Sequence, residues 1–445
     1  MDGMELRNIT KLTSHTLKES PIPSTHPPTP QCPQLPPPAT FPPAPNYAAF
    51  QTSLYTSSIL HGRKPLVTTD PNKLEAQARA ALPLHAYNYV AGGAGERATM
   101  DANRQAFRRW ALVPRMLRDT SAKKVGVELF GVKYDSPILM APVGVQTIFH
   151  KEREVGLAKA CKEIGVPYIM STAASSTIEE VAEASGSGHR WFQLYWPNTD
   201  AITRSLLSRA RASGFSVLVV TLDTWNLAWR PADLDEGYIP FMSGIGNAVG
   251  FSDPVFRAGF AAACGTTPEE KVGLASAGWL KEVCPGRSRT WEDLKMLRGW
   301  WEGPIVLKGI QHVEDARMAV EAGMDGIVVS NHGGRQLDGA VGSLEVLPEI
   351  AAAVGKEITV LFDSGIRTGV DVIKALSLGA EAVLVGRPAV YGFAVGGAEG
   401  AKQVLRGLLA DFEMSLGLAG VDGVKGCKPE ILRRVEGGGD LKSSN

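Results

Sequence analysis

The sequence lacks three features that mark common functional classes: an excess of one charge, paired cysteines and long apolar runs. Its 46 Lys and Arg balance 46 Asp and Glu, so the net charge is zero. Proteins that bind nucleic acids or anionic membranes through phosphates need an excess of positive charge, so we expect neither partner. No segment approaches the roughly 18 uninterrupted apolar residues of a membrane span, so no transmembrane helix is expected.

Only five cysteines are present, and none forms a CxxC pair. An odd, scattered set disfavours a disulfide framework or a cysteine metal site, so we predict no metal and a reducing compartment. No basic start followed by an apolar run indicates a secretory signal. The acidic residues Asp2 and Glu5 disfavour a mitochondrial presequence. We therefore expect a cytoplasmic protein, with the mitochondrion as the alternative.

The prolines gather near the N-terminus, where residues 21–46 hold 12 of the 29. Such a segment forms neither helices nor central strands and buries little surface. We predict a disordered tail over 1–46, a folded domain over 47–435 and a short C-terminal tail over 436–445. Residues 33–36 match the PxxP pattern of polyproline ligands, although a solvated tail is the simpler interpretation.

The remainder of the chain alternates short apolar runs with amphipathic helical patterns. Eight such runs rich in β-branched residues indicate parallel strands with both faces covered, and eight strand–helix units predict an α/β fold with a closed (β/α)₈ TIM barrel. About 80 residues separate the fourth and fifth runs. We expect the segment 233–289 to be a lid-like insertion after strand four. The predicted strands are 138–141, 168–172, 191–195, 217–221, 305–309, 326–330, 359–363 and 382–386.

Polar residues end six of these predicted strands. In (β/α)₈ barrels the catalytic residues lie at the carboxyl ends of the strands. A lysine such as Lys308 at the end of an apolar strand costs desolvation energy unless an anion meets it. The glycines and arginines that follow strands seven and eight fit a phosphate site, which barrels commonly place there. The strand-end residues are Gln193, Tyr195, Thr221, Asp223, Lys308, Ser330, His332, Arg335, Asp363, Gly365, Arg367, Gly386 and Arg387.

His332 and Arg335 share one predicted loop, which places a titratable base beside a fixed cation. The cation can hold a substrate carboxylate while the imidazole removes a proton nearby. Asp223 can accept a hydrogen bond from the other imidazole nitrogen. A different pattern, G-x-G-x-x-A at residues 93–98, follows a helical segment and has no βαβ unit around it, so we do not interpret it as a dinucleotide site.

These motifs together resemble the FMN-dependent L-2-hydroxy acid oxidases and dehydrogenases. Over residues 70–435 they occur in that family's order, and the sequence SNHGGRQLD at 330–338 followed by DSGIR at 363–367 is the most specific. Within the family, the segment TWNLAWRPADL at 224–234, the long insertion and Gly144 look most like lactate 2-monooxygenase. The other matching segments are YNYVAGGAG at 87–95, APVG at 141–144, QLY at 193–195, TLDT at 221–224, LKG at 307–309 and GRP at 386–388.

The resemblance implies FMN as cofactor and a role for each matching residue. His332 would be the base, Asp223 its partner, and Lys308 would face the flavin and act in catalysis with Tyr195. The substrate carboxylate would be held by Tyr89, Arg230 and Arg335, with Tyr195 near its oxygens. The FMN-binding residues would be Pro142, Val143, Gly144, Ser171, Gln193, Thr221, Lys308, Ser330, Asp363, Gly365, Arg367, Gly386 and Arg387.

Two residues depart from the family pattern. Val143 replaces the usual Thr beside the flavin, and Ala173 replaces a Trp of glycolate oxidase, which suggests a roomier pocket. The resemblance implies oxygen as co-substrate and a homo-oligomer, a tetramer or octamer. The sequence leaves hydride and carbanion mechanisms open.

The expected reaction is oxidation of an L-2-hydroxy acid, which has two outcomes. If the 2-oxo acid is retained, it is decarboxylated, so that lactate gives acetate, carbon dioxide and water; we favour this monooxygenase outcome. If it is released, the products are 2-oxo acid and hydrogen peroxide. Two other classes are less consistent with the residues: a non-redox FMN barrel of the isopentenyl diphosphate isomerase kind, and an interaction protein recruited through its Pro-rich tail.

Overall fold

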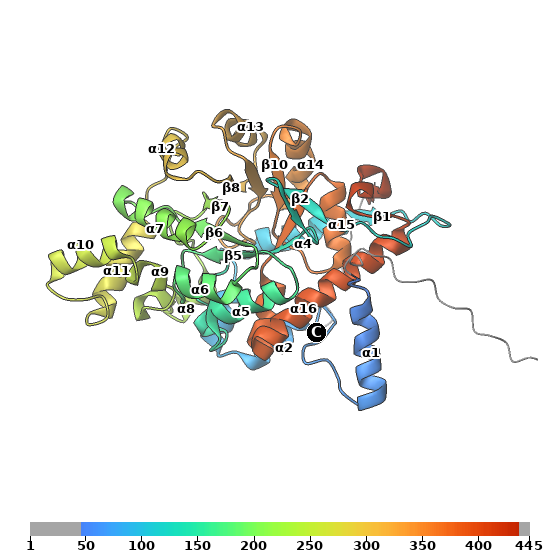
Figure 1. Ribbon diagram of the computed structural model, residues 1–445, viewed down its shortest axis with the longest axis horizontal. Coiled ribbons are helices and arrows are strands. Elements are labelled where there is room, and N and C mark those ends of the chain that lie inside the picture. Colours follow the sequence, from blue (N-terminus) through green and yellow to red (C-terminus); the bar gives the residue numbers. More distant parts are fainter. Residues whose placement is uncertain (1–45, 436–445) are drawn as a thin grey trace, which may run out of the picture. The chain divides into compact units, whose positions relative to one another are not determined.

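A closed barrel of eight parallel strands forms the centre of the protein (Figure 1). The computed structural model describes residues 46–435. The predictions of a disordered N-terminal tail and of a C-terminal tail concern residues outside this range. The predicted α/β barrel is confirmed. Its strands are β4 (Ile138–Met140), β5 (Tyr168–Ser171), β6 (Arg190–Leu194), β7 (Leu218–Thr221), β8 (Ile305–Ile310), β9 (Gly326–Val329), β10 (Thr359–Phe362) and β11 (Ala382–Val385).

The strands neighbour one another in chain order, and β11 pairs with β4 to close the barrel. β8 runs one residue further than expected, because a register shift between Lys308 and Ile310 places Gly309 at φ 111°. Helices cover the barrel from outside: α5 (Arg153–Glu163), α6 (Ile178–Ser185), α7 (Asp200–Ala212), α13 (Val313–Glu321), α14 (Ser343–Val354), α15 (Gly369–Ser377) and α16 (Arg387–Ala419).

The barrel interior is filled by apolar side chains that alternate along the strands. Ile169, Trp191, Val219, Val306 and Val328 belong to one buried cluster inside the barrel. The hairpin of β2 (Val127–Leu129) and β3 (Val132–Tyr134) packs against this cluster through both strands. Since side chains two residues apart face the same way on a strand, the next inward positions lie one layer closer to the carboxyl ends.

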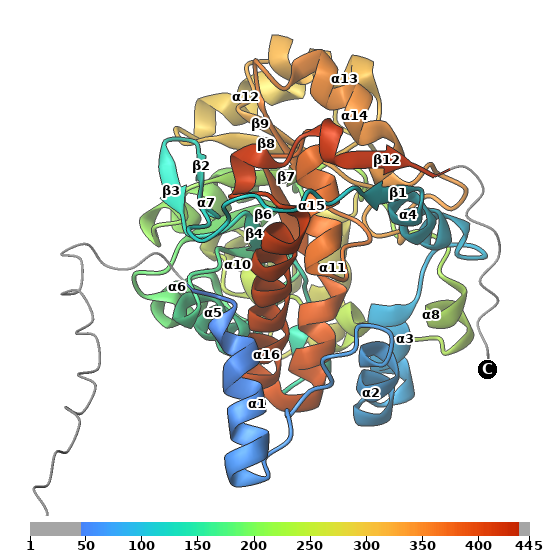
Figure 2. The same cartoon turned by 90° about the vertical axis from the view of Figure 1, so that its right-hand side faces the viewer.

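The N-terminal part of the described chain packs around α16. Helix α1 (Ala49–His61) lies beside α16 in both views (Figure 2), and the backbone N–H of Ala48 donates to Glu413 at 2.7 Å. Helix α16 is broken at Gly396 and Gly397, whose backbone angles are not helical. The other elements there are α2 (Leu74–Ala81), α3 (Leu84–Ala91), α4 (Ala98–Arg108), and β1 (Trp110–Leu112) paired with β12 (Leu432–Arg434).

The long connection between β7 and β8 is helical. It contains α8 (Pro231–Asp235), α9 (Ala248–Phe251), α10 (Pro254–Cys264), α11 (Val272–Val283) and α12 (Asp293–Trp300). Asp253 is fully buried, caps α10 and bonds Ser205 and Arg209 of α7, so the insertion is fastened to the barrel's outer helices. No helix within residues 46–435 is apolar over enough of its length to cross a membrane.

Candidate active site

A pocket opens at the carboxyl ends of the barrel strands and includes most of the predicted residues. Its volume is about 1290 Å³, which includes the solvent space at its open side. The predicted residues that line it are Tyr89, Pro142, Val143, Gly144, Ser171, Tyr195, Arg230, Lys308, His332, Arg335, Asp363, Gly365, Arg367, Gly386 and Arg387. Gln193, Thr221, Asp223 and Ser330 lie directly behind these residues and contact them.

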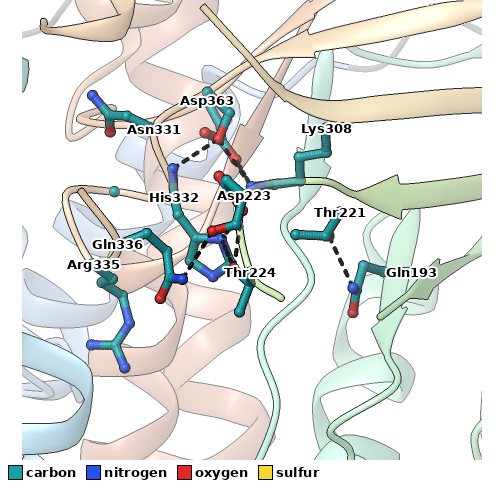
Figure 3. Close-up of polar contacts among 12 residues, drawn as sticks. Gln193, Thr221, Asp223, Thr224, Lys308, Asn331, His332, Arg335, Gln336 and Asp363 are labelled. Carbon is teal, nitrogen blue, oxygen red and sulfur yellow. Dashed lines mark hydrogen bonds and ion pairs between the residues drawn. The ribbon is translucent and has the colours of Figure 1, made fainter. Parts of the chain in front are cut away.

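Strand alternation explains why polar residues meet at this end. The interior apolar residues Ile169, Trp191, Val306 and Leu361 are each followed two positions later by Ser171, Gln193, Lys308 and Asp363. The uppermost inward layer of the barrel is therefore polar, although the layer beneath it is apolar. Figure 3 shows three of these side chains, Gln193 of β6, Lys308 of β8 and Asp363 directly after β10, with Thr221 of β7 between Gln193 and Lys308.

Gln193 orders one side of this polar layer. Its Nε2 donates to Thr221 Oγ1 at 2.9 Å, and its Oε1 accepts from Ser171 Oγ at 3.1 Å (Figure 3). All of its neighbours are buried, and Gln193 itself is 1% exposed. The amide orientation is thus fixed by its own strand neighbours, which leaves Ser171 directed at the pocket.

Lys308 occupies the opposite side of the layer and is 4% exposed. Its Nζ donates to Ser330 Oγ at 3.0 Å and lies 3.1 Å from Asp363 Oδ2. Burial opposes the charged ammonium, but the carboxylates of Asp363 and Asp223 outweigh it and raise the pKa of Lys308. The site therefore contains a permanent buried cation.

His332 and Asp223 form a hydrogen-bonded pair, as predicted. His332 Nδ1 lies 2.8 Å from Asp223 Oδ1, which also accepts a hydrogen bond from Thr224 Oγ1 at 3.0 Å. Asp223 as acceptor fixes the proton on Nδ1, so Nε2 is the nitrogen left to accept a proton. His332 itself adopts φ 57°, in the left-handed region, and Gly333 and Gly334 continue this conformation at φ 66° and 72°.

The electrostatics of the pair keep the imidazole neutral. Burial would raise the pKa of Asp223, but His332 and Lys308 together hold it below its usual value. Burial lowers the pKa of His332; Asp223 acts in the opposite direction and Lys308 adds to the lowering. The pair therefore consists of an ionised carboxylate and a neutral base at neutral pH.

Two guanidinium groups lie at the mouth of the same pocket. Arg335 donates to the carbonyl oxygens of Tyr89 and Gly92, and its guanidinium carbon stands 4.9 Å from the centre of the Tyr89 ring. Arg230 Nε donates to the Arg335 carbonyl oxygen at 3.0 Å. Burial, and next the charge of Arg230, lower the pKa of Arg335 to about 9. Arg230 is buried and Arg335 is half-buried, so these two adjacent cations require an anion, which a substrate carboxylate would supply.

A second pair of cations, Arg367 and Arg387, lines the same pocket, and Arg387 shares the Gly92 carbonyl oxygen with Arg335. Within residues 46–435 both donate to backbone carbonyl oxygens and neither pairs with a carboxylate. Burial, followed by the charge of Arg387, lowers the pKa of Arg367 to about 10. Arg387 also begins α16, whose N-terminal N–H groups favour an anion. This donor set fits the phosphate of a nucleotide-like cofactor.

Several residues of the site were not singled out from the sequence. Asn331 and Asn103 exchange two amide hydrogen bonds at 2.8 and 2.7 Å, which ties the His332 loop to α4. Ser364 Oγ accepts from the backbone N–H of Gly333 at 3.0 Å. The insertion also lines the pocket and forms an apolar wall there. The sequence gave no indication of this wall beyond the length of the insertion. Its residues are Phe241, Gly246, Trp279, Leu280, Val283 and Cys284.

The match to known proteins decides the family. The model of the FMN-dependent dehydrogenase family matches residues 78–434. The chain belongs to this family. The predicted resemblance to FMN-dependent 2-hydroxy acid oxidoreductases is thereby confirmed, and FMN is the cofactor that the cationic end of the pocket fits.

Individual relatives match this chain over most of their length. The chain is 56% identical to the FMN-dependent alpha-hydroxy acid dehydrogenase qulF of Penicillium citrinum, over 89% of this chain and 98% of that protein. It is 39% identical to an L-lactate oxidase of Lysinibacillus sphaericus, over 82% and 92%. A crystal structure of mandelate oxidase superposes with a TM-score of 0.72 at 38% identity, covering 82% of this chain and 98% of that one.

Proposed function

We propose that this chain uses FMN to oxidise an (S)-2-hydroxy acid, with oxygen as the second substrate. The observation that carries the proposal is the single pocket in which His332, bonded to Asp223 at 2.8 Å, faces the guanidinium groups of Arg230 and Arg335. A 2-hydroxy acid has one carboxylate for the cations and one adjacent carbon that must lose hydrogen. Bound FMN supplies the two-electron acceptor and the link to oxygen. The names of the relatives support this substrate class.

The protein's own residues then divide the work. Arg230 and Arg335 bind the carboxylate, Tyr89 and Tyr195 close around the substrate oxygens, and neutral His332 accepts the proton at Nε2. Asp223 stabilises the imidazolium that results. Hydride and carbanion routes make the same demand on His332, because both begin with a neutral imidazole.

We assign the FMN-binding roles by the same reasoning. The half-buried cations Arg367 and Arg387 and the N-terminus of α16 would hold the phosphate. Lys308 would face the flavin ring as the fixed cation of the polar layer. The remaining proposed contacts come from Pro142, Val143, Gly144, Ser171, Gln193, Thr221, Ser330, Asp363, Gly365 and Gly386.

We further propose that the 2-oxo acid is retained, as in lactate 2-monooxygenase. The apolar wall from α11 and the loops before it supports retention, because it covers the pocket on the side away from the barrel. Retained pyruvate and hydrogen peroxide would give acetate, carbon dioxide and water. The oxidase outcome remains the alternative, and the similarity to an L-lactate oxidase supports it.

Gly144 does not separate these two outcomes. A Cβ at this position would stand 2.5 Å from the Ala173 carbonyl oxygen and 2.8 Å from its Cβ. The loops after β4 and β5 are also joined by a hydrogen bond from Val145 N to Ala173 O at 2.8 Å. Packing between the two loops therefore requires glycine here, whatever the fate of the product.

Product stoichiometry tests the proposal directly. The holoenzyme is given L-lactate in air, and oxygen uptake, pyruvate, acetate and hydrogen peroxide are followed together. We expect acetate equal to the oxygen consumed, with no free peroxide. Pyruvate with equimolar peroxide would assign the oxidase outcome, and no turnover of lactate would direct the same assay to mandelate and other larger 2-hydroxy acids.

The pH dependence should follow His332. Because the base must be neutral and burial lowers its pKa, kcat/KM should be constant through neutral pH and fall as the pH is lowered into the acidic range. The inflection should lie below about 6.5, the ordinary value for histidine. A pH profile of kcat/KM over the acidic range measures it. An inflection above neutrality would contradict a buried neutral base.

The other unsettled features are also proposals. We propose a homo-oligomer, a tetramer or octamer, which light scattering of the holoenzyme measures directly. We also propose a folded domain over 47–435, a lid-like function for 233–289 and a cytoplasmic location.

A further inference from the structure

Gln336 lies immediately after Arg335, and both the oxygen and the nitrogen of its side-chain amide form hydrogen bonds. Its Oε1 accepts from Arg230 Nη2 at 2.6 Å. Its Nε2 donates to the Asp223 carbonyl oxygen at 2.9 Å and to that of Asn226 at 3.0 Å. Figure 3 shows the amide directed toward Asp223. One side chain therefore joins a substrate-facing guanidinium to the segment that carries the partner of His332.

The partners on the two sides of the Gln336 side chain require an amide at this position. Arg230 presents a donor and needs an acceptor, whereas two carbonyl oxygens on the other side need donors. A carboxylate in this position would place an oxygen against both carbonyl oxygens. It would also neutralise Arg230, which is 7% exposed and bonds no carboxylate within residues 46–435.

The neutral charge of the Gln336 amide matters because few negative charges lie near Arg230. Asp233 is the carboxylate whose charge acts on both Arg230 and Arg335, yet it forms no hydrogen bond with either, and burial raises its pKa. The positive charge of the two guanidiniums is therefore left largely uncompensated by the described chain. A neutral partner holds Arg230 in place without consuming that charge.

We propose that Gln336 is a positioning residue that sets the affinity of the site for the substrate carboxylate. It fixes Arg230 relative to Asp223 and leaves the charge of Arg230 to the ligand. This inference rests on the proposed function, because it takes the ligand of Arg230 to be a 2-hydroxy acid or its 2-oxo product. Its effect should thus fall on binding more than on the chemical step.

The test compares Gln336→Glu and Gln336→Met with the unaltered holoenzyme. Pyruvate and phenylglyoxylate are titrated without oxygen and binding is followed by the flavin absorbance, while KM and kcat are measured with the hydroxy acid that turns over. Gln336→Glu should raise KM and the Kd of the 2-oxo acid together by about tenfold or more, with a smaller change in kcat. Gln336→Met should raise both by less, because it removes the hydrogen bonds and adds no charge.

Gln311→Glu is the matched control. Gln311 follows β8, and its Nε2 also donates to a backbone carbonyl oxygen, that of Val341 at 2.9 Å, but it does not bond Arg230. The same chemical change there should leave KM and Kd unaltered. FMN content, read from the absorbance ratio, confirms that each variant is loaded.

The outcomes separate this inference from the proposed function. Unaltered Kd values in Gln336→Glu, or a loss of kcat without a change in Kd, would overturn the positioning role. If Gln336→Glu does not fold, an unaltered Kd in Gln336→Met overturns it equally. Failure of the unaltered enzyme to oxidise any 2-hydroxy acid would instead refute the proposed function, and the titrations would still decide how Gln336 affects carboxylate binding.

Discussion

Replacing His332 by Gln should slow reduction of the flavin by substrate by about 10²–10⁴-fold, the usual contribution of a general base. Glutamine retains a polar side chain of similar reach but cannot take up a proton. Asp223 would keep its bond to Thr224, and Lys308 its contacts to Ser330 and Asp363, so the surrounding layer has no reason to collapse. FMN should therefore stay bound while the chemical step fails.

Anaerobic stopped-flow bleaching of the flavin measures this step apart from the reaction with oxygen. The matched control is His61→Gln, since His61 is exposed at the end of α1 and far along the chain from the site. The control should reduce its flavin at the normal rate. Bleaching of His332→Gln within about threefold of that rate would show that another group accepts the proton.

The barrel was predictable because its strands carry the strongest local signal that a sequence offers. Each buried strand is short and apolar, and each is followed by a helical pattern, which leaves few alternatives to parallel pairing. The alternation within strands also placed Lys308 and Asp363 inside the barrel two positions beyond Val306 and Leu361. The polar strand ends were predicted to lie together because the carboxyl ends of all barrel strands meet on one face.

The contacts that orient the site were not predictable from local sequence. Asn103 and Asn331 are 228 positions apart, and only the packing of α4 against the barrel brings their amides together. Gln336 lies within a recognised motif, but its partners Arg230 and Asp223 come from another loop. Such pairings depend on tertiary geometry. The residue types therefore indicate a polar site but do not show which residues form hydrogen bonds with one another.

The insertion shows a different limit. The sequence predicted a long, lid-like insertion without its internal structure, and the structure contains helices α8–α11 there. Pro231 and Pro254 stand at helix starts, where proline is well tolerated, and so they mark boundaries of helices. The apolar wall that these helices place over the pocket follows from their docking on α7, which no local pattern encodes.

Replacing Lys308 by Met should destabilise the FMN-free protein by about 3–5 kcal/mol, the usual cost of removing one partner from a buried ion pair. The aliphatic part of the side chain would still fill the barrel. The carboxylate of Asp363, 3.1 Å away and 7% exposed, would lose the cation that offsets its burial. Ser330 Oγ would also lose the hydrogen bond that it accepts from Lys308 Nζ at 3.0 Å.

Denaturant unfolding without FMN gives the free energy of unfolding of each variant, so that cofactor binding makes no contribution. The control is Lys374→Met, because half-buried Lys374 makes one hydrogen bond, to the Phe107 carbonyl oxygen at 2.9 Å, and no ion pair within the described residues. It should cost about 1 kcal/mol.

The double variant Lys308→Met/Asp363→Asn identifies the cause. Asparagine removes the uncompensated charge but can still accept the hydrogen bond that Ser364 donates to Asp363 Oδ1 at 2.8 Å. If the loss comes from a stranded carboxylate, the double variant should regain most of the stability that Lys308→Met loses. Equal losses in the single and double variants would mean that the loss comes from the hydrogen bond to Ser330 and not from a stranded carboxylate. The buried cation would then be retained for the cofactor and not for the fold.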